Sequence, residues 1–258
     1  MALSGAAATI SDGVKYVILD GGKRIRPMIF LSAAELFSAP CESAYFFALG
    51  IECYHTFTLV HDDLPCMDDD DFRRGKPSCH KVFGEGQAVL IGDALQNLAY
   101  IFILKSIEAS DSPVRALKAA GLFGSYSGAV GLISGQSADI DEKTPTDDKT
   151  LEYIYRHKTC DLFCASAAAG AVLGGGTENE TELLTEFALN YGYVFQITDD
   201  LLDRNKNESR TVLKNHSEQE IFVLLDNYVK KAERALYLLN KDTTFFENLL
   251  KRTLNRRK

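Results

Sequence analysis

The chain has 258 residues, of which 46% are hydrophobic, so it can bury a sizeable core and disorder is not its expected state. It carries 28 basic and 36 acidic residues, a net charge of −8, which would repel nucleic acid and anionic membrane surfaces. We therefore predict no nucleic-acid partner. An anionic ligand would have to be captured by basic residues gathered locally.

The six cysteines form no C-x-x-C pair and have no histidine at the spacing of a zinc site, which predicts reduced thiols in a reducing compartment. No segment has the ~20 uninterrupted apolar residues of a membrane span, and the N-terminus lacks a basic region followed by an apolar run. We expect a soluble, cytoplasmic protein without an integral membrane segment. A plastid location stays open if a transit peptide has been removed.

Apolar residues recur every three or four positions, and no alternating run is long enough for a sheet. This periodicity predicts helices at 13–20, 27–38, 42–63, 85–108, 112–135, 147–173, 179–203, 217–240 and 243–256. Gly, Ser and Pro separate them, as at Gly21-Gly22 and Thr144-Pro145. No linker or repeat divides the chain, so we predict an all-α, single-domain helical bundle over residues 1–258.

Two of these helical stretches are apolar on more than one face. They are "AVLIGDALQNLAYIFIL" at 88–104 and "CASAAAGAVLGGG" at 164–176. Such helices must be buried at the centre of a bundle or covered by a partner subunit.

Two clusters of carboxylates stand out from this apolar background. "DDLPCMDDDD" at 62–71 holds six aspartates in ten positions, and "FQITDDLLD" holds Asp199, Asp200 and Asp203. Each cluster lies near the C-terminal end of a predicted helix, where the helix dipole disfavours negative charge, so a compensating cation is expected. Oxygen ligands without His or Cys favour Mg²⁺; Ca²⁺ competes, but its usual loop pattern is absent. For the first cluster, a solvated acidic turn is the simpler alternative.

Basic residues accompany the first cluster. "GGKRIRP" at 21–27 places Lys23, Arg24 and Arg26 at a glycine turn that leads into a helix, and "RRGKP" at 73–77 follows the aspartates. Arg and Lys suit phosphate groups, although ordinary solvated loops have the same composition. Acidic clusters for a metal, basic residues for an anion and an apolar helical interior together favour a substrate with phosphates and a hydrophobic tail.

Six stretches occur in the order found in one enzyme family: "GGKRIRP", "HDDLPCMDDDDFRRGKPSCHKVFGE", "GDAL", "GQSADI", "HKT" and "FQITDDLLD". On these motifs the chain resembles the short-chain trans-isoprenyl diphosphate synthases, the farnesyl and geranylgeranyl diphosphate synthases. The resemblance implies the all-helical isoprenoid synthase fold around a central apolar cavity, three Mg²⁺ ions and a homodimer. It also implies Mg²⁺-dependent head-to-tail condensation of isopentenyl diphosphate with an allylic diphosphate, dimethylallyl or geranyl.

The same resemblance implies roles for individual residues. The metal would be held by Asp62, Asp63, Asp68 and Asp199, with Asp200 and Asp203 completing the second motif, partly through water. The allylic diphosphate would contact Arg73 and Lys158, and isopentenyl diphosphate would contact Lys23, Arg26, His55 and Arg74. Thr159 and Gln196 would orient the reacting groups. The released diphosphate would take the final proton, which fits the lack of a Ser-His-Asp or Cys-His constellation.

Residues just before the first motif help to form the pocket floor in this family. Phe57 and Thr58 lie five and four positions before Asp62, and the ring of Phe57 could block a growing tail. With the extra Pro65-Cys66 inside the motif, this resembles the bacterial-type farnesyl diphosphate synthases, so we predict farnesyl diphosphate as the product. Geranylgeranyl diphosphate is the alternative, and Phe57 could equally be a core residue.

The chain departs from the family pattern in three ways: it begins a few residues before "GVKYVILDGGKRIRP", where a further helix is usual, it is short, and it lacks the Gly-Lys-rich segment expected after the second motif. Lys206 or Lys214, in "RNKNESRTVLKNHSEQE", could take the place of the missing lysine. Three other functions remain open. A terpene cyclase would leave the basic motifs unexplained, a non-catalytic regulatory subunit predicts eroded aspartates, and an acidic helical scaffold predicts no Mg²⁺-dependent diphosphate binding.

Overall fold

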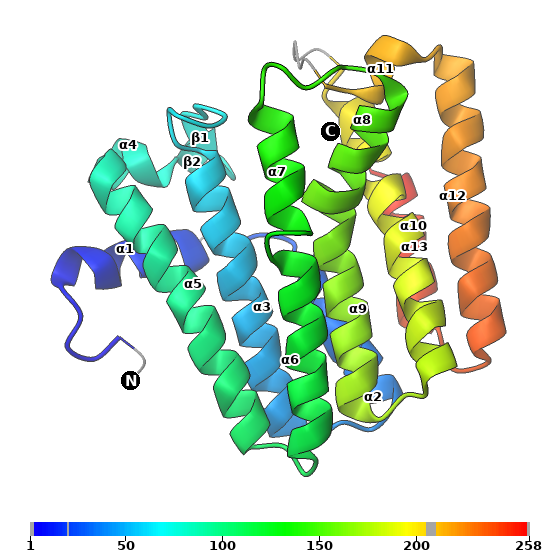
Figure 1. Ribbon diagram of the computed structural model, residues 1–258, viewed down its shortest axis with the longest axis horizontal. Coiled ribbons are helices and arrows are strands. Elements are labelled where there is room, and N and C mark those ends of the chain that lie inside the picture. Colours follow the sequence, from blue (N-terminus) through cyan, green and yellow to red (C-terminus); the bar gives the residue numbers. More distant parts are fainter. Residues whose placement is uncertain (1–2, 20, 205–209, 257–258) are drawn as a thin grey trace. The chain divides into compact units, whose positions relative to one another are not determined.

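A computed structural model describes residues 3–19, 21–204 and 210–256 (Figure 1). Helices make up most of these residues, so the predicted all-α class is confirmed. The chain forms two compact units, which we describe one at a time. The first comprises the residues up to Met28 with Pro40–Pro113, and the second comprises Ile29–Ala39 with the residues from Val114 onwards. A single-domain organisation stays a prediction.

The first unit is built on two long helices, α3 (Cys41–Asp62) and α5 (Glu85–Glu108), which pack side by side (Figure 1). Buried residues of α5 recur every four positions, at Ile91, Leu95, Ala99 and Ile103, and this spacing forms one continuous apolar face. The shorter helices α1 (Ala8–Ile18) and α4 (Cys79–Phe83) also pack against α5. The first turn of α2 (Ile25–Leu36) belongs to this unit as well.

A small hairpin lies between α3 and α4. Its strands are β1 (Phe72–Arg73) and β2 (Lys76–Pro77), paired antiparallel. The two turn residues, Arg74 and Gly75, have φ of 55° and 81°. Positive φ at both positions is the geometry of a two-residue hairpin turn and favours Gly at the second. Sequence analysis did not anticipate this hairpin because each strand is only two residues long.

The second unit contains the remaining helices: α6 (Pro113–Ser127), α7 (Leu132–Ile140), α8 (Asp148–Ile154), the π-helical η1 (Tyr155–Cys160), α9 (Asp161–Gly174), α10 (Glu178–Leu202), α11 (Val212–Asn215), α12 (Glu218–Leu239) and α13 (Thr244–Leu254). Helix α10 packs against η1, α9, α12 and α13. Every residue of α9 is buried, as its all-round apolar sequence predicts. Capping boxes begin α10 at Thr177 and α12 at Ser217.

Two predicted helices are divided or irregular in the structure. The predicted helix over 112–135 is two helices, because the chain turns at Gly128–Gly131 before α7 begins. The predicted helix over 147–173 runs through α8, η1 and α9, and its middle turn is π-helical. Helix α1 begins at Ala8 rather than near residue 13, and the short α4 and α11 were not predicted.

Two helical stretches of the described residues, Glu85–Glu108 and Pro113–Ile140, are long and apolar enough by length and composition to cross a membrane. The core helices of globular proteins pass the same test, so this is weak evidence. The second stretch is interrupted by the turn that separates α6 from α7.

Candidate active site

The first acidic motif lies at the C-terminal end of α3. The helix ends at Asp62, one residue before the predicted end, and the chain then folds back so that Asp68 N–H donates to the Asp62 carbonyl at 2.9 Å. A second backbone bond joins Asp69 N–H to the Leu64 carbonyl at 3.1 Å. The turn therefore keeps Asp62, Asp63 and Asp68 near one helix end, where backbone carbonyls add negative potential and attract a cation.

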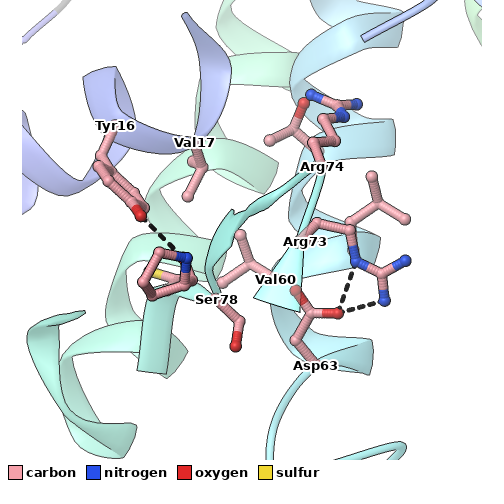
Figure 2. A pocket seen from close by; sticks show the side chains of 11 residues that line it. Tyr16, Val17, Val60, Asp63, Arg73, Arg74 and Ser78 are labelled. Atoms are coloured by element: carbon pink, nitrogen blue, oxygen red, sulfur yellow. Dashed lines mark hydrogen bonds and ion pairs between the residues drawn. The ribbon is translucent and has the colours of Figure 1, made fainter. Parts of the chain in front are cut away.

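Arg73 of β1 pairs with the buried carboxylate of this motif (Figure 2). Asp63 is only 2% exposed, and Arg73 Nε donates to its Oδ1 at 2.8 Å while Nη2 donates to the same atom. Nη2 also donates to Asp70 Oδ2 at 2.7 Å. Burial raises the pKa of the Asp63 carboxyl, and the hydrogen bond from Arg73 opposes that rise. One arginine thus compensates charge at two carboxylates of the motif.

A cluster of basic residues surrounds His55, in the middle of α3. Arg26 Nη1 lies 3.2 Å from His55 Nε2, so the imidazole accepts this hydrogen bond and carries its proton on Nδ1. Burial, followed by the charges of Arg26 and Arg74, holds the pKa of His55 well below 6.5. Arg74 Nη1 also donates to the Gly21 carbonyl at 3.0 Å, on the segment that carries the exposed Lys23. The arginines give this region a positive potential, and the neutral His55 accepts a hydrogen bond without offsetting their charge.

The pocket drawn in Figure 2 is too small for a substrate. Its volume is about 30 Å³, whereas pockets for small-molecule ligands measure roughly 300–1,000 Å³. Residues of α1, α3 and the hairpin line it, and Tyr16 Oη donates to the Pro77 carbonyl at 2.7 Å. This contact attaches α1 to the hairpin and so supports the two adjacent arginines.

The two residues predicted to set the pocket floor are both buried. Phe57 is 8% exposed and packs edge-to-face on Tyr54 and His61, with ring centroids 4.8 and 5.3 Å apart. Thr58 Oγ1 donates to the His55 carbonyl at 2.8 Å. These contacts are those of core residues within the first unit.

In the second unit, η1 and α10 bring together two of the three residues predicted to be catalytic, Thr159 and Gln196, whereas the third, Lys158, contacts α7. Thr159 Oγ1 donates to Gln196 Oε1 at 2.8 Å, and Gln196 Nε2 donates to Asp200 Oδ1 at 3.0 Å. Lys158 Nζ donates to Asp139 Oδ2 of α7 at 2.5 Å. The π-helical turn thus directs the consecutive side chains of Lys158 and Thr159 toward two different helices, α7 and α10.

Asp200 is held by protein groups on both carboxylate oxygens. It is 4% exposed, and its Oδ2 accepts hydrogen bonds from Tyr155 Oη, from Thr211 Oγ1 at 2.6 Å and from Val212 N–H at 3.1 Å. Tyr155 Oη in turn accepts from Val212 N–H at 3.0 Å. This network ties the end of α10 to the start of α11. Lys206 lies outside the described residues.

Asp199 has a cationic partner near the C-terminal end of the described chain. Arg256 Nη1 donates to Asp199 Oδ1 at 2.5 Å, and its guanidinium stacks over Phe195 with 4.3 Å from Cζ to the ring centroid. Asp203 caps the C-terminal end of α10. In the second motif, Asp200 is therefore buried and hydrogen-bonded within the protein, whereas Asp199 and Asp203 lie at the end of the helix.

Sequence reasoning did not single out the partners that hold these side chains. They are Asp139, Tyr155, Thr211 and Arg256, together with Glu52, which pairs with Arg24. Asp139 lies inside the quoted stretch "GQSADI". An acidic residue in a family motif with no assigned role could have indicated that it holds a basic residue of the site. The other four lie outside the quoted motifs and had no comparable signal.

Comparison with known proteins identifies the family of the chain. The model of one family, described as "Polyprenyl synthetase", matches residues 7–217. The chain belongs to this family. The match covers most of the chain and contains both acidic motifs.

Relatives of this polyprenyl synthetase family member include plant enzymes. The heterodimeric geranylgeranyl pyrophosphate synthase large subunit 1, chloroplastic, of Arabidopsis thaliana is 46% identical over 204 residues, which cover 77% of this chain and 55% of the relative. The chloroplastic geranylgeranyl pyrophosphate synthase of Capsicum annuum is 45% identical over 200 residues, 77% of this chain and 54% of the relative. The chain thus spans about half the length of the curated relatives it matches.

Solved structures agree over a longer part of the chain. A geranyltransferase from Legionella pneumophila superposes with a TM-score of 0.86 at 31% identity, covering 96% of this chain and 88% of the other. An FPP/GFPP synthase from Zymomonas mobilis gives a TM-score of 0.89 at 31% identity, covering 95% and 88%. The predicted family and its all-helical isoprenoid synthase fold are therefore confirmed.

Proposed function

We propose that the protein is a prenyltransferase that condenses isopentenyl diphosphate with an allylic diphosphate. The observation that carries this proposal is the pairing of both acidic motifs with basic side chains, Asp63 with Arg73 and Asp199 with Arg256, in a member of the polyprenyl synthetase family. Carboxylates next to cations suit a ligand that contains both a metal ion and a diphosphate. The metal ion can take the place of the arginine beside each carboxylate, and the diphosphate can take the place of the carboxylate beside each arginine.

The residues of both motifs fit Mg²⁺. Their side-chain donors are carboxylate oxygens, the type that Mg²⁺ prefers, and we propose Asp62, Asp63, Asp68, Asp199 and Asp203 as residues that hold it. Bound Mg²⁺ would neutralise charge on a departing diphosphate. Asp200 is better suited to an indirect role, because four protein donors already use its carboxylate.

The remaining roles follow from charge and from hydrogen bonding. Arg73 and Lys158 would bind the allylic diphosphate and stabilise its charge as the C–O bond breaks. Lys23, Arg26 and Arg74 would bind isopentenyl diphosphate, with the neutral His55 positioning the guanidinium of Arg26. Thr159 and Gln196 would orient the reacting groups. No separate protein base is required if the released diphosphate takes the proton.

For the product, the names of the relatives favour geranylgeranyl diphosphate over our first prediction of farnesyl diphosphate. The two plant relatives described above are geranylgeranyl pyrophosphate synthases. The burial of Phe57 against Tyr54 and His61 weakens the argument that its ring limits the product, since core packing explains the same position. We therefore propose geranylgeranyl diphosphate as the product, with farnesyl diphosphate as the second candidate. The chloroplastic relatives favour a plastid over the cytoplasm.

To test the proposal, the protein is incubated with isopentenyl and geranyl diphosphates, with and without Mg²⁺. The chain length of the dephosphorylated alcohols is then measured. We expect Mg²⁺-dependent geranylgeraniol. Farnesol alone would support the reaction but contradict the proposed product; Phe57→Ala should then lengthen the product if the ring forms the pocket floor.

Asp62→Asn should lower turnover at least about a hundredfold, whereas Asp148→Asn, in an exposed carboxylate of α8, should not. Absence of condensation by the folded protein would instead favour a non-catalytic subunit.

A further inference from the structure

A buried histidine beside the first acidic motif has no partner within the protein. His80, in the first turn of α4, is 6% exposed, and neither Nδ1 nor Nε2 makes a hydrogen bond. Leaving buried polar atoms unsatisfied costs about 1–3 kcal/mol each, so folded proteins rarely tolerate it without a ligand, an ion or water. His80 therefore needs a partner from outside the chain.

Two carboxylates lie within reach of this imidazole. One ligand atom each from Asp69, Asp71 and His80 can be chosen so that all three lie within 4.8 Å of one another. Asp69 and Asp71 are exposed, so the group is open to solvent on one side and closed by His80 on the other. Among the residues that the structure describes, this is the one such group of three potential metal ligands.

One carboxylate of the group already binds a cationic side chain, which a metal ion would have to share or displace. Lys81 Nζ lies 2.5 Å from Asp71 Oδ1, and this hydrogen bond lowers the pKa of the Asp71 carboxyl. Asp71 remains ionised and has a second oxygen for another ligand. Ser78 holds the segment in place, because its N–H donates to the Asp71 carbonyl at 2.9 Å and its hydroxyl donates to the Asp70 carbonyl.

We propose that Asp69, Asp71 and His80 form a binding site for a first-row divalent transition-metal ion, such as Mn²⁺, Co²⁺ or Zn²⁺, separate from the Mg²⁺ ligands proposed above. An imidazole nitrogen selects these ions over Mg²⁺, which prefers an all-oxygen set. Two carboxylates balance the charge of the ion, and the solvent side leaves positions for water. The metal would supply the partner that His80 lacks.

Metal binding here would stabilise the loop that carries Arg73 and Arg74. Asp69 and Asp71 precede the hairpin that carries Arg73 and Arg74, whereas His80 follows it in α4. A metal bound to all three would cross-link the two ends of this hairpin segment. The site would thus act on the position of the two arginines, and it does not depend on the proposed function.

Electron spin-echo measurements on the Mn²⁺-loaded full chain, in excess Mg²⁺, test this site. A coordinated imidazole nitrogen gives a characteristic modulation, whereas the oxygen-only motifs give none. We expect this modulation in the native protein and its loss in His80→Gln. It should persist in His216→Gln, the matched control, because His216 pairs with Asp148 in the second unit. Absence from the native protein, or persistence in His80→Gln, would overturn the proposal.

A second variant guards against misfolding of His80→Gln. Asp69 is exposed and has φ of 50°, a conformation that Asn tolerates, so Asp69→Asn should fold normally. Titration with Co²⁺ in excess Mg²⁺ should show affinity at least about tenfold weaker for Asp69→Asn, because losing a ligand costs more than losing a second-shell contact. Asp148→Asn should bind Co²⁺ as the native protein does. Equal affinity in all three proteins would exclude the site.

Discussion

His55 is a histidine whose surroundings keep it neutral. Burial, and then the charge of Arg26, hold its pKa well below 6.5, so the folded protein disfavours the proton that the unfolded chain accepts. The stability that this provides is complete above 6.5 and is lost as the pH falls through the folded pKa. We expect the free energy of unfolding to fall by up to about 1.4 kcal/mol per pH unit in that window from this residue alone.

Urea denaturation of the native protein and His55→Gln on both sides of pH 6.5 measures this effect. The variant should lose the part of the pH dependence that His55 contributes. Glutamine retains a hydrogen-bond acceptor for Arg26, and His216→Gln, at a partly buried histidine of the second unit, is the control. An identical pH dependence in native protein and His55→Gln would show that folding does not lower the pKa of this imidazole.

At the scale of residues, the sequence identified the chemistry of the motifs but not the contacts within them. Asp63 and Arg73 are ten residues apart in adjoining motifs, so an acid and a base in one loop could be anticipated. The bond from Arg256 to Asp199 could not be, because 57 residues separate the two and α12 and α13 lie between them. The same holds for Tyr155 and Asp200, 45 residues apart. Such partners depend on tertiary packing rather than on local pattern.

At the scale of elements, Gly135 of α7 shows how closely that helix approaches η1. A Cβ at this position would lie 2.2 Å from Lys158 N and 2.7 Å from the His157 carbonyl carbon, both backbone atoms that cannot rotate away. Gly135→Ala should therefore destabilise the protein by about 1–3 kcal/mol and disturb the bond between Lys158 and Asp139. Chemical denaturation and turnover measure the two effects.

Gly121→Ala is the matched control for this change. It lies in α6 with open space around its Cβ position, and alanine there should be neutral or stabilise by up to about 1 kcal/mol. If Gly135→Ala were as stable as Gly121→Ala, the packing of α7 on η1 would be looser than the structure has it.

Tyr155 joins three elements of the second unit through its hydroxyl. It donates to Asp200 of α10 and accepts from Val212 N–H of α11, while its own backbone belongs to η1. Tyr155→Phe removes a bond to a buried carboxylate and should cost about 1.5–3 kcal/mol of stability. Thermal and urea unfolding should show this loss, and Tyr237→Phe, 84% exposed on α12, should show none. Equal melting of the two variants would contradict a structural role for this network.

The long helices were predictable because their ends are marked locally. The bounds of α5 agree with the predicted 85–108, and α10 and α12 differ from prediction by one residue at each end, since Thr177 and Ser217 provide capping boxes. The π-turn η1 and the division between α6 and α7 were not predictable. Their apolar spacing continues across both irregularities. A Cβ at Gly131, where the chain turns before α7, would lie 1.9 Å from the Tyr126 carbonyl oxygen, a contact that spacing alone does not reveal.

At the scale of the whole molecule, α5 leaves four large apolar side chains exposed on a face that also carries the exposed Asp93 and Asn97. Val89, Leu90, Tyr100 and Leu104 are 41–59% exposed, although the opposite face of the helix packs in the core. The sequence predicted that a helix apolar all round would need either burial or a partner subunit, and one side of α5 is buried. We propose that a second copy of the chain covers the other side, giving the homodimer that the family resemblance implies.

Sedimentation of the native protein should therefore give a dimer, and the double variant Tyr100→Glu and Leu104→Glu should give a folded monomer. Each buried apolar side chain is worth about 1.5–3 kcal/mol, and a symmetric interface counts each change twice, so the combined loss exceeds what most dimers tolerate. Tyr237→Glu, an equally drastic change on the exposed face of α12, should remain a dimer. A monomeric native protein that binds uncharged lipid vesicles through the same two residues would assign this face to a membrane instead, which the length and hydropathy of α5 also permit.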